Sequence, residues 1–113
     1  MIYKILSRAE WAEAEKAGRY DGSPDDHRDG FIHLSSANQV RGTAEKYFRN
    51  QNDLALVSFE AEDFGDALKW EPSRGGALFP HLYASLETGL AKAVTSLPLG
   101  DDGVPIVPDL GAD

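Results

Sequence analysis

The sequence predicts a single α+β domain, with helices in the first half of the chain and strands dominating the second half. The periodic segments follow the order strand, helix, strand, helix and then several strands, which differs from the regular alternation of an α/β protein. The chain has 113 residues, 42% of them hydrophobic, which suffices for one core and is too short for two domains. We expect the domain to cover residues 1–98 and an irregular tail, rich in Pro, Gly and Asp, to cover residues 99–113.

The first strand and the first helix are predicted at the N-terminus. Residues 2–6, IYKIL, alternate so that Lys4 shares one face with two apolar residues. A capping box follows, in which Ser7 is paired with Glu10 three residues later, and a glycine at position 18 gives a typical end. A helix is therefore expected between Ser7 and Gly18.

The second strand is predicted after a loop. Residues 19–30, RYDGSPDDHRDG, contain so many turn formers that we expect a surface loop. Residues 31–35, FIHLS, then read as a strand with Phe31, His33 and Ser35 on one face. Because His33 and Ser35 share a face, their side chains are expected to point into the same space.

The second helix is predicted to start at Ser36, whose spacing to Gln39 matches a second capping box. We therefore expect Ser36 to cap this helix, which leaves Ser35 free. The apolar stripe that supports the helix consists of Val40, Ala44, Tyr47 and Phe48.

The second half of the chain is predicted to be mostly sheet. The segment LALVSFE, residues 54–60, is typical of a buried strand, and AEDFGDAL is at most a helical turn. Further strands are expected at KWE (69–71), HLYASL (81–86) and AKAVTSL (91–97).

Composition limits the function. Nineteen acidic against eleven basic residues give a net charge of −8, which disfavours nonspecific nucleic-acid binding. No apolar run approaches the roughly 20 residues of a membrane helix, and the N-terminus lacks a signal-peptide pattern, so we expect a cytoplasmic protein without membrane contact. The absence of cysteine removes disulfides, thiolate catalysis and cysteine-based zinc sites. The three histidines lack metal-binding spacings, so no metal is expected.

His33 and Glu71 are candidate site residues, each with a structural alternative. His33 either binds a ligand or transfers a proton, or it is a core histidine with a satisfied hydrogen bond. Glu71 lies in KWEPSRGG, before a flexible loop, where a carboxylate meets a substrate hydroxyl or pairs with Lys69 or Arg74. The same Arg74–Gly76 segment is a weak candidate for approaching a phosphate, because it lacks the complete glycine-rich motifs.

His81 and Tyr83 form a second candidate pair. They lie two residues apart on a predicted strand and so point in the same direction. They are either a polar pair on the wall of a site or a core tyrosine whose hydroxyl binds the histidine. A catalytic triad of Ser35, His33 and an acid is not expected, because two residues apart on one strand is a poor geometry for proton transfer.

The succession IYKIL, EW, DGFIHLSSANQV, LKWEPSRGG and FPHLY resembles a bacterial and plant family, number 952 of the domains of unknown function. The resemblance extends over residues 2–98, with the motifs in the family's order. It implies an ADP-ribosyltransferase-like fold, in which two small sheets flanked by helices enclose a cleft. Relatives of that fold include the RNA 2′-phosphotransferases, and the cleft holds NAD or an ADP-ribosylated intermediate.

The resemblance also implies roles for the candidate residues. Glu71 would stabilise positive charge on the ribose as nicotinamide leaves, and His81 would carry a proton. The other implied ligand contacts are His33 or Lys4 to the ribose or diphosphate, Ser35 to the ribose or amide, and Tyr83 as a stacking ring. NAD would be a substrate, and no prosthetic group is expected.

The sequence also departs from those enzymes. The first strand has no histidine, no ExE or QxE pair occurs late in the chain, and the full arginine set of the 2′-phosphotransferases is missing. Three functions therefore stay open: an enzyme acting on NAD or an ADP-ribosylated substrate, a non-catalytic module that binds a nucleotide or ADP-ribose, and a partner-binding domain.

Overall fold

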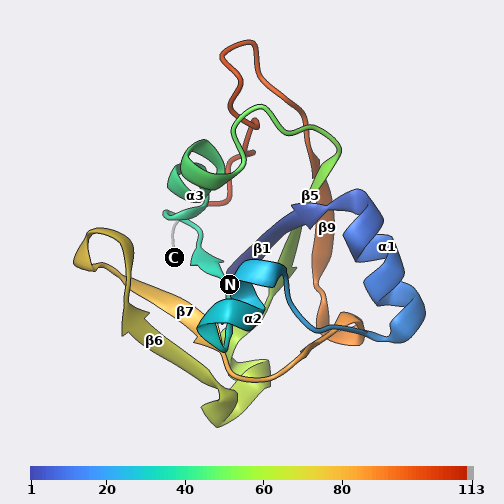
Figure 1. Cartoon of the computed structure of the whole chain (residues 1–113), viewed down its shortest axis with the longest axis vertical. Helices are drawn as coiled ribbons and strands as arrows, with labels where there is room; N and C mark the ends of the chain where they lie inside the picture. Colours follow the sequence, from blue (N-terminus) through green and yellow to red (C-terminus); the bar gives the residue numbers. More distant parts are fainter. Residues whose placement is uncertain (112–113) are drawn as a thin grey trace.

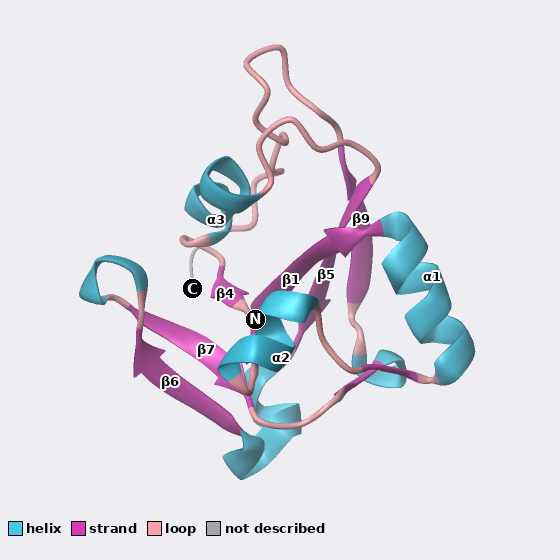
Figure 2. Ribbon diagram, viewed as in Figure 1, coloured by secondary structure: helices cyan, strands magenta, loops and turns pink. Residues whose placement is uncertain are grey.

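The computed structural model describes residues 1–111, apart from the side chain of Arg74, and its architecture is α+β with small antiparallel sheets (Figures 1 and 2). A four-stranded sheet has the order β4-β1-β5-β9, and a three-stranded sheet has the order β3-β7-β6. A third pairing joins β2 (Arg19–Tyr20) to β8 (Leu86–Glu87). In Figure 1 the β6–β7 hairpin extends away from the β1–β5–β9 sheet, with α2 in front of the junction.

The N-terminal predictions are confirmed. β1 (Ile2–Ser7) leads directly into α1 (Arg8–Ala17), whose N-cap is Ser7. The Ser7 hydroxyl accepts a hydrogen bond from the Glu10 backbone N–H at 3.0 Å, and the Glu10 carboxylate accepts one from the Ser7 N–H at 3.3 Å. The helix ends at Gly18, which has a φ of 85° that a residue with a side chain adopts at a cost.

The two central strands of the four-stranded sheet, β1 and β5, are buried on both faces, because their side chains alternate between two cores. β5 (Leu54–Phe59) is buried at every residue, as predicted for this segment. One core takes Val57 and Phe59 together with Trp11 of α1, and the other takes Leu54 and Leu56 together with residues of α3.

The prediction of a surface loop over residues 19–30 is wrong, because this segment contains β2 and a short helix, α2 (Pro24–Asp29). Ser23 caps α2 and forms a second capping box with Asp26. Proline at the first helical position and glycine at position 30 complete the helix signals. The turn formers of this segment therefore mark the two ends of a helix.

The strand predicted over residues 31–35 is divided between two sheets. β3 (Ile32–His33) pairs with β7 (Leu78–Leu82), whereas β4 (Ser35–Ser36) pairs with β1. Leu34 lies between them and donates its N–H to the Pro80 carbonyl. The chain thus crosses from one sheet to the other at Leu34.

The prediction that Ser36 caps the second helix is wrong. The helix α3 (Val40–Tyr47) begins later, its N-cap is Gln39, and no side chain of residues 1–111 caps it. The Gln39 side chain accepts a hydrogen bond from the Ser36 N–H, but the Ser36 hydroxyl donates to Asn38 at 2.6 Å. The Ser36 hydroxyl, which the predicted capping box requires at the helix start, is therefore bound to the neighbouring Asn38 side chain.

The second half of the chain is mainly sheet, as predicted. The 3₁₀ helix η1 (Ala61–Ala67) precedes β6 (Leu68–Pro72), and β9 (Ala93–Leu97) forms an edge of the large sheet. Two further 3₁₀ turns are η2 (Arg74–Gly76) and η3 (Thr88–Leu90). Residues 98–111 contain one isolated bridge, Leu99 with Pro105, and no longer strand. Within residues 1–111, no helix has both the length and the apolar character that crossing a membrane requires.

Candidate functional site

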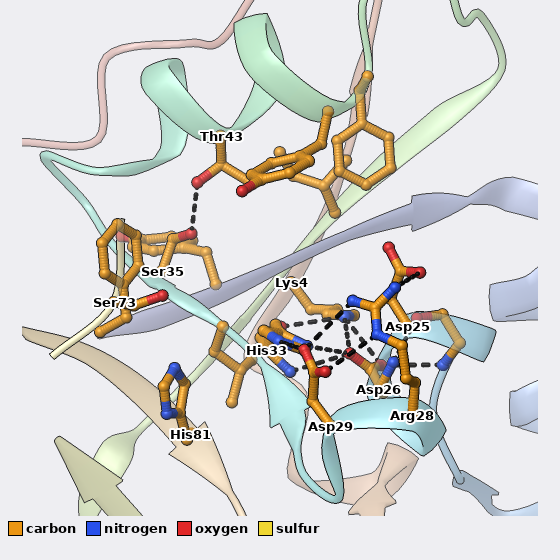
Figure 3. Close-up of a pocket in the computed structure, with 17 residues that line it drawn as sticks. Lys4, Asp25, Asp26, Arg28, Asp29, His33, Ser35, Thr43, Ser73 and His81 are labelled. Carbon is orange, nitrogen blue, oxygen red and sulfur yellow. Dashed lines mark hydrogen bonds and ion pairs between the residues drawn. The ribbon is translucent and has the colours of Figure 1, made fainter. Parts of the chain in front are cut away.

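A cavity of about 240 Å³ lies where β1, α2, α3 and β7 meet (Figure 3). The crossing at Leu34 creates this meeting point, since it leads from β3 at one side of the cavity to β4 at the other. One part of the wall is ionic and comes mainly from α2, and the other part carries hydroxyl and aromatic side chains.

The ionic wall is organised around Asp26, which is 3% exposed. Its carboxylate accepts hydrogen bonds from the Lys4 ammonium at 3.1 Å and from the Ser23 N–H at 2.8 Å. The backbone N–H of His33 donates to the same carboxylate at 3.1 Å. Lys4 also donates to the His33 carbonyl at 3.0 Å, so one carboxylate and one ammonium join β1, α2 and β3.

The imidazole of His33 lies between two carboxylates. Its Nδ1 is 2.6 Å from Asp26, and its Nε2 is 2.9 Å from Asp29, one turn of α2 further on. Both contacts are hydrogen bonds only when the ring carries a proton on each nitrogen. The side chain of His33 is about one-third exposed, so it forms part of the cavity surface and is not a closed core residue.

The electrostatics of the buried pair follow from burial and from the partners. Burial alone would raise the pKa of Asp26, but the hydrogen bond from His33 and the charge of Lys4 more than offset it, so this pKa lies well below its usual range. Burial lowers the pKa of Lys4, and Asp26 acts in the opposite direction. Asp26 is therefore an anion at neutral pH, and its charge holds the ammonium in place.

The opposite wall can hydrogen-bond and stack. The hydroxyls of Ser35 and Thr43 lie 3.0 Å apart and join β4 to α3 (Figure 3). Ser73 adds a third hydroxyl, and the aromatic rings on this wall include Phe48 and Phe79. A ligand with an aromatic ring and several hydroxyl groups matches such a surface.

A second hydrogen-bond network lies at the β7 end of the cavity. His81, directly opposite His33 in the β3–β7 pairing, has its Nδ1 2.9 Å from the Glu71 carboxylate. The Tyr83 hydroxyl donates to the same Glu71 oxygen at 2.7 Å. These hydrogen bonds, that of Tyr83 first and that of His81 second, keep the pKa of Glu71 below its usual range. The hydrogen bond between Tyr83 and Glu71 also raises the pKa of Tyr83.

The structure brings most of the predicted residues to this region. Lys4, His33, Ser35 and His81 line the cavity. Glu71 and Tyr83 do not line it and instead bind each other, and Glu71 also binds His81. The side chain of Arg74 lies outside the described part of the structure.

Sequence reasoning missed Asp26 and Thr43. The available signal for Asp26 was its position three residues after Ser23, which matches a capping box. Thr43 had only a helical signal, its place one turn after Gln39 on α3. Neither pattern reveals that the side chain faces a cavity.

No group of three or more His, Cys, Asp or Glu side chains able to hold a metal ion occurs within residues 1–111.

Comparison with known proteins gives a family and a fold. The family described as "Protein of unknown function (DUF952)" matches residues 5–96. The crystal structure of protein CC0527 from Caulobacter crescentus is 54% identical, with a TM-score of 0.91 over 93% of this chain and 92% of that one. The solution NMR structure of CC0527 is 55% identical, with a TM-score of 0.84 over 92% and 90% of the two chains. No curated protein matches the chain.

Proposed function

The chain belongs to the family of proteins of unknown function DUF952, and we propose that its cavity binds the nucleoside part of a ribonucleotide such as NAD or ADP-ribose. The observation that carries the proposal is a cavity wall that combines hydroxyl groups with aromatic rings, opposite the ionic wall. The hydroxyls of Ser35, Thr43 and Ser73 suit a sugar, and the aromatic rings beside them suit a base.

The size of the cavity supports a nucleoside over a whole dinucleotide. About 240 Å³ is below the roughly 300–1,000 Å³ typical of pockets that enclose drug-sized ligands. We therefore expect one ribose and its ring to enter, while the remainder of a dinucleotide lies outside.

The charge of the cavity indicates which part of NAD enters it. When the His33 ring is neutral, the described lining residues carry three carboxylates (Asp25, Asp26 and Asp29) and two cationic groups (Lys4 and Arg28). An excess of negative charge repels a phosphate and attracts a cation. The nicotinamide ring of NAD is positively charged, so the nicotinamide riboside half fits better than the diphosphate.

Binding is favoured over ADP-ribosyl transfer because of the position of Glu71. A transferase needs a carboxylate beside the ribose to stabilise the developing positive charge. Glu71 does not line the cavity, and one of its oxygens already accepts hydrogen bonds from Tyr83 and His81. Asp26 is likewise occupied by Lys4 and His33.

The proposal is tested by thermal melting and calorimetry with NAD, nicotinamide riboside, ADP-ribose and 2′-phosphorylated RNA. A ligand at one hundred times its Kd stabilises the native state by about 2.7 kcal/mol. We expect NAD and nicotinamide riboside to raise Tm by several degrees and inorganic phosphate to leave it unchanged. Nicotinamide release, measured in the same samples, detects turnover.

The matched variants are Thr43→Val and Thr95→Val. Both exchange a hydroxyl for a methyl group, but Thr43 lines the cavity and Thr95 is exposed on β9. The Thr43 variant should weaken nicotinamide riboside binding about tenfold, and the Thr95 variant should bind like the unmodified protein. If none of the four compounds changes Tm, the nucleoside proposal is wrong, and a partner-binding role becomes the favoured function. Steady nicotinamide release would replace the binding role with an enzymatic one.

A further inference from the structure

We infer that His81 presents an unprotonated Nε2 to the cavity and accepts a hydrogen bond there from a ligand hydroxyl. This makes His81 the residue that selects hydroxyl-bearing ligands, and Glu71 the positioning residue that fixes its tautomer. The choice of a ribose hydroxyl as the donor rests on the function proposed above.

The first observation is a buried nitrogen without a partner. His81 is 4% exposed, and its Nε2 is buried without a hydrogen-bond partner among residues 1–111. Buried polar atoms are nearly always paired with protein or with ordered water, so an orphaned one requires an explanation. Two other such atoms, on Trp11 and Tyr20, belong to residues that do not line this cavity.

The second observation is the direction of the ring. Nδ1 is bonded to Glu71 on β6, away from the cavity. In Figure 3 the other nitrogen of His81 points toward the space below Ser73 and beside His33. That nitrogen is Nε2, and it lies on the cavity side of the ring.

The third observation shows that the proton shared with Glu71 belongs to Nδ1 of His81. Glu71 is a carboxylate and can only accept, so Nδ1 of His81 carries the hydrogen that it donates. In the neutral ring, Nε2 then holds a lone pair. The Tyr83 hydroxyl donates to the same Glu71 oxygen and so keeps that carboxylate in place.

The ring also has little freedom to turn. Phe31 stacks on His81 with 4.0 Å between ring centroids and an interplanar angle of 22°. His33 meets the ring edge-on at 5.7 Å. A rigid acceptor rejects a ligand that offers another acceptor, because two lone pairs then face each other without a proton.

Two variants of His81 separate its two nitrogens. His81→Asn keeps an amide near the Nδ1 position, beside Glu71, and removes the group at Nε2. His81→Gln reaches the Nε2 position and loses the group near Glu71. We expect His81→Asn to lose about tenfold or more in affinity for nicotinamide riboside, and His81→Gln to retain most of it.

The positioning role of Glu71 has its own readout. In Glu71→Gln the amide can donate to Nδ1, which moves the ring proton to Nε2. Long-range ¹H–¹⁵N NMR of ring-labelled protein should show Nε2 unprotonated in the original chain and protonated in Glu71→Gln. Glu87→Gln, which alters an exposed carboxylate on β8, is the control and should leave the spectrum unchanged.

The outcomes distinguish this inference from the proposed function. Nucleoside binding that is equally strong in His81→Asn overturns the inference and leaves the proposed function intact. An Nε2 that is protonated in the free original protein also overturns the inference. If no nucleotide binds, the same NMR experiment with D-ribose and glycerol decides: an Nε2 signal that shifts with these alcohols supports the acceptor role, and an unchanged signal overturns it.

Discussion

At the residue scale, Asp26 links three elements through one carboxylate. It receives hydrogen bonds from Lys4 of β1, from Ser23 at the start of α2, and from both the backbone and the ring of His33 in β3. A buried charge is tolerated only when partners replace the water that it lost. Removing this one charge would therefore leave a buried ammonium without its counterion.

Asp26→Asn should lower the free energy of unfolding at pH 7 by about 3 to 5 kcal/mol, because breaking a buried ion pair strands the other charge. The depressed pKa of Asp26 also determines the pH dependence. The ion pair contributes fully above the unfolded-state pKa of about 3.9, and its contribution is lost as the pH falls toward the lower folded-state value.

Urea unfolding at pH 7, 5 and 3 checks this prediction, since the gap between the original protein and Asp26→Asn should narrow as the pH falls. Asp25→Asn is the matched control, because Asp25 is exposed on the same helix and, within residues 1–111, forms its ion pair with Arg28 at the surface. Its cost should stay below about 1 kcal/mol. A gap that stays constant from pH 7 to pH 3 would contradict the role given to the Asp26 charge.

His33→Ala should affect ligand binding more than folding. The backbone N–H of residue 33 still donates to Asp26 in this variant, so only the ring contacts are lost. We expect a stability loss of about 1 to 2 kcal/mol and disappearance of the Tm shift caused by nicotinamide riboside. His27→Ala, an exposed histidine of α2, is the control. A loss as large as that of Asp26→Asn would make His33 a structural residue.

The sequence could predict site residues on strands but not on α2. Strand alternation placed His33 and Ser35 on one face, and both line the cavity. Asp26 lies in an acidic run that is typical of solvated surface, and it becomes buried only because α2 packs against β1 and β3. That docking depends on long-range contacts, which local patterns do not contain.

At the element scale, the start of α2 depends on Gly22. This residue has a φ of 113°, and a Cβ placed on it would lie 2.9 Å from the Cβ of Asp26. Gly30, which ends the same helix, has a φ of 85° and open space around it. The two glycines therefore share a backbone cost and differ in crowding.

Gly22→Ala should cost about 2 to 4 kcal/mol, the sum of backbone strain and displacement of Asp26, and Gly30→Ala only about 1 kcal/mol. Urea denaturation of both variants measures the difference. Equal losses of stability in the two variants would show that Asp26 moves away from a Cβ at residue 22 without cost, and that close packing between Gly22 and Asp26 does not stabilise the site.

The element predictions failed where one local signal had two readings. Ser23, Pro24 and Gly30 are turn formers, but they are also a cap, a first helical residue and a helix end. The alternation through residues 31–35 is real, yet β3 and β4 belong to different sheets. Only pairing partners far along the chain, β7 and β1, decide where a strand divides.

At the scale of the whole molecule, the C-terminal segment covers the second core. Val107 is 9% exposed within the cluster that contains Val40 and Ala44 of α3, and Leu110 packs against it. The Arg41 side chain donates to the Val107 carbonyl, and the Asn50 N–H donates to Gly103. In Figure 1 this segment runs back from the top of the molecule to α3. Residues 98–111 thus contribute packing although they contain almost no regular structure.

A chain that ends at residue 98 should therefore unfold at a lower urea concentration than the full chain. It should also bind nicotinamide riboside more weakly, because Phe48 contacts both the Val107 cluster and the cavity. In the full chain, Val107→Ala should cost about 1 to 3 kcal/mol through the cavity that it leaves. Ile106→Ala is the matched control, since Ile106 is 54% exposed and should change stability by less than about 0.5 kcal/mol. If residues 1–98 alone are as stable as the full chain and bind as tightly, the segment is only an appendage to a domain that ends at β9.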